Sequence, residues 1–114
     1  DNYTSVKDCG IFLKKIYQIS KGIIDSSSLP NAEAMYYHLK MQQRKNKIPA
    51  DLPEGVQTAN KTGELSDVEN DAGILYDSEN DLVIVFLSQN LVNASAAQNT
   101  IASLSKEIYT YYNQ

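Results

Sequence analysis

Residues 56–88 read VQTANKTGELSDVENDAGILYDSENDLVIVFLS, and their pattern indicates the fold class. It contains three strand candidates, Val56–Glu64, Asn70–Tyr76 and Leu82–Ser88, which are separated by turn-forming Gly, Ser, Asp and Asn. Their short connections predict an antiparallel meander. The run Leu82–Leu87 is apolar without alternation, which is typical of a central strand covered on both faces.

Two helices are predicted before these strands. The first begins at a Thr4 or Ser5 cap and ends at Lys21-Gly22, and its apolar face comprises Val6, Cys9, Leu13, Ile16 and Tyr17. The second runs from Leu29-Pro30-Asn31 to Met41 or Gln43, and its apolar positions are Met35, Tyr36 and Leu39.

A last helix is predicted after the strands, from Asn93 or Ser95 to about Tyr112. Its apolar face comprises Ala97, Ile101, Leu104, Ile108 and Tyr112. The order helix, helix, loop, three strands, helix predicts an α+β fold, in which helices cover a three-stranded antiparallel meander. We find no internal repeat or linker, so residues 1–114 are expected to form one unit.

Composition narrows the functional classes. A chain of 114 residues with 42% hydrophobic residues is of single-domain size and excludes a wholly disordered protein. Its longest apolar run is far shorter than the roughly 20 residues of a membrane span, and no signal peptide is recognisable. The net charge of −4 argues against a nucleic-acid partner. A lone Cys9 and a single His38 leave no disulfide and no Cys/His metal site, and no cofactor is predicted.

The segment Gln42–Gly55 is predicted to be an ordered loop, because Pro49 and Pro53 exclude a continuous helix. It carries three cations, Arg44, Lys45 and Lys47. Such a cluster forms either a solvated surface or an anion site, and composition does not choose between them.

Lys61-Thr62-Gly63 lies in the first strand candidate. An ammonium, a hydroxyl and a residue without a side chain along one strand edge make an anion-binding ledge, because glycine lets a ligand approach the backbone.

The context of this tripeptide resembles the C-terminal part of class A β-lactamases and their relatives among serine penicillin-recognising enzymes. Ile48-Pro49-Ala50 and Leu52-Pro53-Glu54-Gly55-Val56 lead into Lys61-Thr62-Gly63, and Asn70-Asp71-Ala72-Gly73-Ile74 follows on the next strand. The resemblance implies a β-lactamase-like transpeptidase fold and a serine hydrolase that opens β-lactam rings through an acyl-enzyme.

The resemblance also implies roles for individual residues. Lys61 and Thr62 would hold the carboxylate of a β-lactam or of a D-Ala-D-Ala-like peptide, Gly63 would let it approach, and the Glu64 backbone N–H would donate to the oxyanion. Relatives often carry an arginine near this carboxylate, on the second strand or in the loop. The strand position here is Ala72, and Lys47 occupies the loop position, so a point charge is expected to replace a bidentate group.

The nucleophile half is not recognised in this sequence. Ser103-Leu-Ser-Lys106 and Ser88-Gln-Asn90 match the remaining family motifs in spacing but follow Lys61-Thr62-Gly63, whereas the family's nucleophile precedes it. Because the chain also begins at Asp1 rather than Met, we expect it to be a C-terminal portion that is inactive alone and that binds its N-terminal half or self-associates through the Leu82–Ser88 edge. The resemblance implies an extracytoplasmic bacterial protein.

Other functions stay open at this point. A D,D-peptidase fragment would use the same residues. A non-catalytic module would retain the ledge to bind a carboxylate ligand or cell-wall peptide, and a structural or regulatory partner would bind no ligand.

Overall fold

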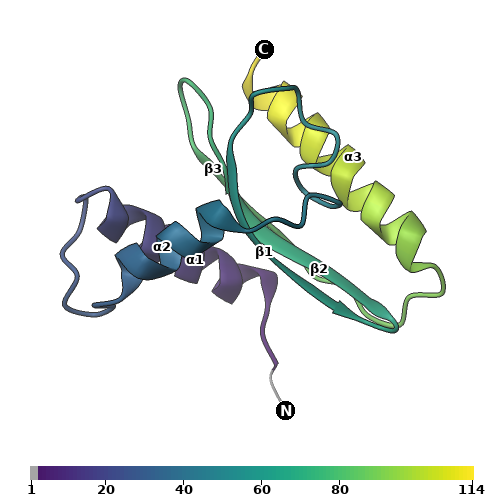
Figure 1. Cartoon of the computed structure of the whole chain (residues 1–114), viewed down its shortest axis with the longest axis horizontal. Helices are drawn as coiled ribbons and strands as arrows, with labels where there is room; N and C mark the ends of the chain where they lie inside the picture. The colour runs from purple at the N-terminus through teal and green to yellow at the C-terminus, as the bar shows by residue number, and fades with distance from the viewer. Residues whose placement is uncertain (1–2) are drawn as a thin grey trace.

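The structure, a computed structural model, describes residues 3–114 and has three helices and one three-stranded sheet (Figure 1). The α+β prediction is confirmed. The elements are α1 (Val6–Ser20), α2 (Ala32–Met41), β1 (Thr58–Leu65), β2 (Val68–Leu75), β3 (Leu82–Phe86) and α3 (Ala94–Tyr112).

The sheet is the predicted antiparallel meander, in the order β1-β2-β3. The hairpin between β1 and β2 is longer than predicted, because pairing continues through Glu64 and Glu69 to Leu65 and Val68. The prediction ended the first strand at Glu64 and began the second at Asn70, because it assigned the residues between them to a turn. The strand β3 ends at Phe86, two residues before the predicted end.

Helices cover both faces of the sheet, with α1 and α2 on one side and α3 on the other (Figure 1). The core cluster of the first side contains Ile16, Tyr36, Ala59 and Ile74. Those of the second side are Ile48, Leu75, Ile84 and Ile101. Alternate residues of each strand therefore belong to separate cores, as the pleat of a strand requires.

The expectation that Leu82–Leu87 is central and covered on both faces is wrong for the described residues. The centre of the sheet is β2, and β3 lies at an edge. On β3, Ile84 is buried, whereas Val83 is 39% exposed on the opposite face. The short helix pair α1 and α2 covers less of the sheet than a continuous apolar strand would need.

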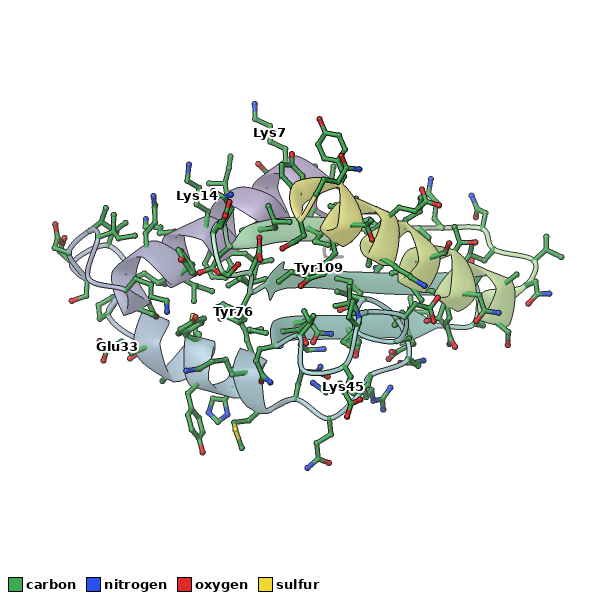
Figure 2. The ribbon with its side chains drawn as sticks, turned by 90° about the horizontal axis from the view of Figure 1, so that it is seen from above. Lys7, Lys14, Glu33, Lys45, Tyr76 and Tyr109 are labelled. Carbon is green, nitrogen blue, oxygen red and sulfur yellow. The ribbon has the colours of Figure 1, made fainter. Side chains whose placement is uncertain are left out.

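The predicted helix ends agree closely with the structure. The Ser5 hydroxyl oxygen caps α1 by accepting a hydrogen bond from the Asp8 N–H at 3.1 Å. Gly22, with a φ of 73°, follows the helix in the left-handed conformation that glycine adopts without strain. Lys7 and Lys14 project from α1 away from the strands (Figure 2).

The predicted apolar faces are only partly buried. Val6 on α1, and Leu104 and Tyr112 on α3, are exposed. The buried stripe of α3 instead contains Ile101, Ala102 and Ser105, and the Ser105 hydroxyl donates to the Ile101 carbonyl at 2.7 Å. The predicted apolar face did not include this serine, whose burial is tolerated because its hydroxyl is hydrogen-bonded within the helix.

None of the helices in residues 3–114 has the length and hydrophobicity of a membrane-spanning segment.

Two glycines make a matched test of sheet packing. A Cβ on Gly73 would lie 2.6 Å from the Asn60 Cβ and 2.9 Å from the Ala59 carbonyl oxygen, whereas a Cβ on Gly10 would meet only Val85 Cγ2 at 3.9 Å. We expect Gly73→Ala to destabilise the fold by about 1–3 kcal/mol through overpacking. Gly10→Ala should stabilise it by up to about 1 kcal/mol, since alanine favours a helix. Urea unfolding followed by circular dichroism measures both, and equal effects would contradict this packing.

Candidate functional site

The predicted ledge lies at the free edge of β1. Neighbouring residues of a strand point to opposite faces, so Lys61 lies toward α1 and α2 and Thr62 lies toward α3. The Lys61 ammonium donates a hydrogen bond to the backbone carbonyl of Thr62. This bond leaves the ammonium without a carboxylate partner among the described residues, so its charge is available to an anion.

A hollow of about 380 Å³ opens beside this edge. It is lined by Met41, Gln42, Gln43, Arg44, Lys61 and Thr62. The end of α2 and the start of the following loop therefore form one wall, and β1 forms the other. Two cations, Arg44 and Lys61, border the same space, which suits an anionic group.

A second groove, of about 530 Å³, lies between the sheet and the helices α1 and α2. Its helical wall includes Phe12, Leu13, Met35 and Leu39, and it also reaches Lys61, Thr62 and Gly63. Phe12 is about half exposed there. The ledge therefore borders both a polar hollow and an apolar groove, and an apolar surface next to a polar edge is typical of a site that binds another molecule or segment.

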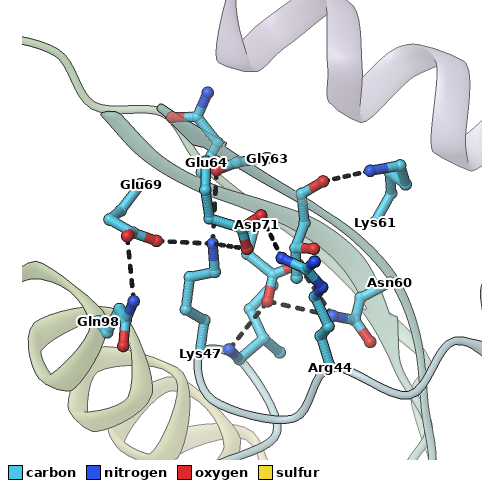
Figure 3. A network of polar contacts seen from close by, with 12 residues as sticks. Arg44, Lys47, Asn60, Lys61, Gly63, Glu64, Glu69, Asp71 and Gln98 are labelled. Atoms are coloured by element: carbon cyan, nitrogen blue, oxygen red, sulfur yellow. Dashed lines mark hydrogen bonds and ion pairs between the residues drawn. The ribbon is translucent and has the colours of Figure 1, made fainter. Parts of the chain in front are cut away.

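Lys47 is not accessible to a ligand at the ledge in this structure. Its side chain is fully buried on the α3 side, and its Nζ lies 2.8 Å from Glu64 Oε1 and 2.8 Å from Glu69 Oε2 (Figure 3). The Gly63 carbonyl oxygen, at 3.4 Å, is a third acceptor. All three N–H donors are therefore engaged, and the expected contact of Lys47 with a substrate carboxylate is replaced by an internal ion pair.

Glu64 bonds both to the buried Lys47 and to the exposed Arg44. Its second carboxylate oxygen accepts a hydrogen bond from Arg44 Nη1 at 2.8 Å. The hydrogen bond from Lys47 lowers the pKa of the Glu64 carboxyl most strongly, the charges of Lys47 and Arg44 lower it further, and partial burial opposes them. The Thr62 hydroxyl adds a smaller contribution in the same direction. Glu64 thus stays ionised below the usual pH range of a glutamate.

A second polar group fixes the loop behind the ledge. The buried Asp71 carboxylate accepts hydrogen bonds from Asn60 Nδ2 at 2.9 and 3.1 Å and from the Ile48 N–H at 3.0 Å. Burial raises the pKa of Asp71, and these hydrogen bonds counteract the rise. Asn60 in turn accepts from Gln42, so the start of the loop at Gln42 and its middle at Ile48 are both bound to the pair of strands β1 and β2.

Sequence reasoning missed Glu69, Asp71 and Arg44 as members of this network. A buried lysine requires a counter-charge, so the presence of Lys47 next to an apolar isoleucine was a usable signal. The partners themselves come from β1 and β2 and become neighbours only once the register is known. The spaced serine motifs lie elsewhere: Ser88 bonds to the backbone of Glu69, and Ser103 lies on an exposed part of α3.

Comparisons with known proteins identify the family and the fold. The model of the Beta-lactamase enzyme family matches residues 1–112. Among solved structures, a β-lactamase from Sphaerobacter thermophilus DSM 20745 is 24% identical with a TM-score of 0.80, over 95% of this chain and 40% of that one. PBP-A is 22% identical with a TM-score of 0.80, over 96% of this chain and 40% of that one.

A β-lactamase from Francisella tularensis is 19% identical with a TM-score of 0.70, over 96% of this chain and 42% of that one. A mutant of PBP-A has been solved as an acyl-enzyme complex with penicillin G. No curated protein matches the sequence. The chain therefore spans about 40% of the length of the solved structures it resembles, and these identities establish the fold rather than the activity.

The buried lysine gives a prediction about stability. Lys47→Met should lower the free energy of unfolding by about 3 kcal/mol or more, because it leaves the Glu69 carboxylate buried without its cation. The exposed neighbour gives the control, and Lys45→Met should change stability by no more than about 0.5 kcal/mol. Adding Glu69→Gln to Lys47→Met should recover part of the loss. Chemical denaturation measures all three, and a neutral Lys47→Met would contradict the ion pair.

Proposed function

Because this chain belongs to the Beta-lactamase enzyme family, we propose that it supplies the Lys61-Thr62-Gly63 wall of a serine hydrolase that opens β-lactam rings through an acyl-enzyme. The observation that carries the proposal is the position of Lys61 and Thr62 on the free edge of β1, beside an open hollow that Arg44 also borders. A free strand edge offers backbone groups to a substrate amide, and the Lys61 ammonium offers charge to its carboxylate.

Each residue of the motif has a separate task in this proposal. Lys61 and Thr62 bind the substrate carboxylate, Gly63 keeps the approach to the backbone open, and the Glu64 N–H is one of the donors to the oxyanion. Lys47 does not contact substrate, because its charge is used inside the protein. It supports the ledge indirectly by holding the Glu64 side chain and the Gly63 carbonyl.

Catalysis also needs a nucleophile, which we assign to an N-terminal half of the same protein. The apolar groove at the ledge offers a surface for that half, since Phe12, Leu13, Met35 and Leu39 lie along it. The proposed complete protein is an extracytoplasmic bacterial enzyme, a location that antibody labelling of intact and permeabilised cells would test.

A non-catalytic module that binds a carboxylate ligand or a cell-wall peptide is the second candidate. The polar hollow alone would suffice for it, because binding requires the cations but no nucleophile. A D,D-peptidase portion would share every assigned residue and differ in substrate. Turnover of a β-lactam after addition of the N-terminal half separates the hydrolase from the module, and release of D-alanine from a peptide identifies the peptidase.

The first functional prediction concerns Lys61. The chain alone should not hydrolyse a chromogenic β-lactam, and mixing it with a separately produced N-terminal half should give turnover. In that mixture Lys61→Ala should lower kcat/KM about ten- to a hundredfold, since one charge-assisted hydrogen bond contributes about 1.5–3 kcal/mol. Lys45→Ala, which removes an exposed charge, is the control. Equal turnover for Lys61→Ala and wild type would contradict the assignment, as would a stoichiometric penicillin adduct on Ser103 of the isolated chain.

The second functional prediction concerns the open edge of β3. Within residues 3–114 this strand pairs only with β2, and it carries no charge or proline that would discourage pairing with another chain. We expect the isolated chain to self-associate through Leu82–Ser88, unless the N-terminal half occupies that edge. Val83→Lys should shift it toward monomer in light scattering, whereas Val92→Lys, on an exposed loop, should not. A wild-type monomer at high concentration would contradict this expectation.

A further inference from the structure

The Glu64 carboxylate binds two cations, Arg44 and Lys47, next to the ledge. One of its oxygens is 2.8 Å from Arg44 Nη1, and the other is 2.8 Å from Lys47 Nζ. Glu64 directly follows Lys61-Thr62-Gly63, and Arg44 borders the polar hollow together with Lys61 and Thr62. The Glu64 carboxylate therefore already binds cations close to the place where a substrate carboxylate is proposed to bind.

The charges of the ion-pair network that includes Arg44 balance one another. Lys47 is shared between Glu64 and Glu69, while Arg44 pairs with Glu64 alone. These two cations and two carboxylates cancel one another. Lys61, which borders the hollow, has no carboxylate partner within residues 3–114, and its ammonium bonds to a neutral carbonyl.

The two cations of Glu64 differ in accessibility. Lys47 is fully buried, so no ligand can reach it, whereas the Arg44 side chain is 69% exposed. A guanidinium carries five N–H donors in a fixed fork, and Glu64 is within hydrogen-bond distance of one nitrogen of Arg44. Arg44 is thus the cation for which Glu64 and a bound anion would compete.

We infer that Glu64 is a specificity-determining residue: as an internal carboxylate on Arg44, it weakens the contribution of Arg44 to binding a substrate carboxylate, so the site discriminates less strongly between a carboxylate and its neutral analogue. The inference rests on the proposed function, because it assumes that substrate binds along Lys61 and Thr62. A second carboxylate beside Glu64 would repel it at short range and would have to share or displace the Arg44 pair. A neutral carboxamide meets no such repulsion.

The expected effect is modest, because Arg44 is exposed and solvent screens its charge. Glu64→Gln removes the negative charge, yet its amide oxygen still accepts hydrogen bonds from Lys47 and Arg44, and Lys47 keeps Glu69 as its counter-charge. The substitution therefore removes the negative charge and keeps the size and hydrogen bonding of the side chain nearly unchanged. Glu54→Gln is the matched control for net charge, because Glu54 lies on an exposed turn of the loop that carries Arg44.

The test measures binding of two probes to the full chain by NMR titration at low ionic strength. The probes are N-acetyl-D-alanyl-D-alanine and its C-terminal amide, which differ in the carboxylate alone. Glu64→Gln should bind the acid about threefold to tenfold more tightly than wild type and should bind the amide equally well. Added salt should reduce this gain, adding Arg44→Gln should abolish it, and Glu54→Gln should show none.

The outcomes separate this inference from the function on which it rests. Binding of the acid that is lost in Lys61→Gln but is equal in wild type and Glu64→Gln overturns the role of Glu64 and leaves the ledge standing. An equal gain for the acid and the amide also overturns it, because a structural loosening would act on both probes. Absence of saturable binding in wild type and Glu64→Gln alike overturns the ledge itself, and the role of Glu64 falls with it.

Discussion

The buried ammonium of Lys47 holds together the two glutamates, Glu64 and Glu69, that close the β1–β2 hairpin. The two glutamates face each other in the β1–β2 register, where like charges would destabilise the hairpin. The lysine removes that repulsion from inside the protein, at 2.8 Å from each. Since Gln98 of α3 also donates to Glu69, at 3.0 Å, one buried cation connects the loop, the hairpin and the last helix.

This arrangement determines which charges reach the surface. Strand alternation places Lys61 on the side of α1 and α2, whereas Lys47 lies on the α3 side beneath the same strand. Two lysines that are 14 positions apart in sequence therefore have different tasks. One is neutralised in the interior and maintains the strand, and the other remains available beside an open hollow.

The sequence predicted the parts of this protein that depend on local pattern. Strand candidates, the Ser5 cap, the Gly22 helix end and the Lys61-Thr62-Gly63 ledge follow from periodicity, turn chemistry and resemblance, and the fold prediction was confirmed. The burial of Lys47 was not predicted, because a lysine in a loop that contains prolines is usually solvated. Its burial depends on Glu64 and Glu69, which face each other only through a register that runs past the predicted strand ends.

The two carboxylates on Lys47 are not equivalent, and this difference connects stability with specificity. The Glu69 side chain is 5% exposed and the Glu64 side chain 27%, so the former is the obligatory partner of a buried cation. Glu64 is shared with a surface arginine and can lose its charge without leaving Lys47 unpaired. Under the proposed function, one substitution at position 64 changes the preference for anions while the ion pair between Lys47 and Glu69 is preserved. Glu64 can be replaced without loss of this support, because Lys47 also pairs with Glu69.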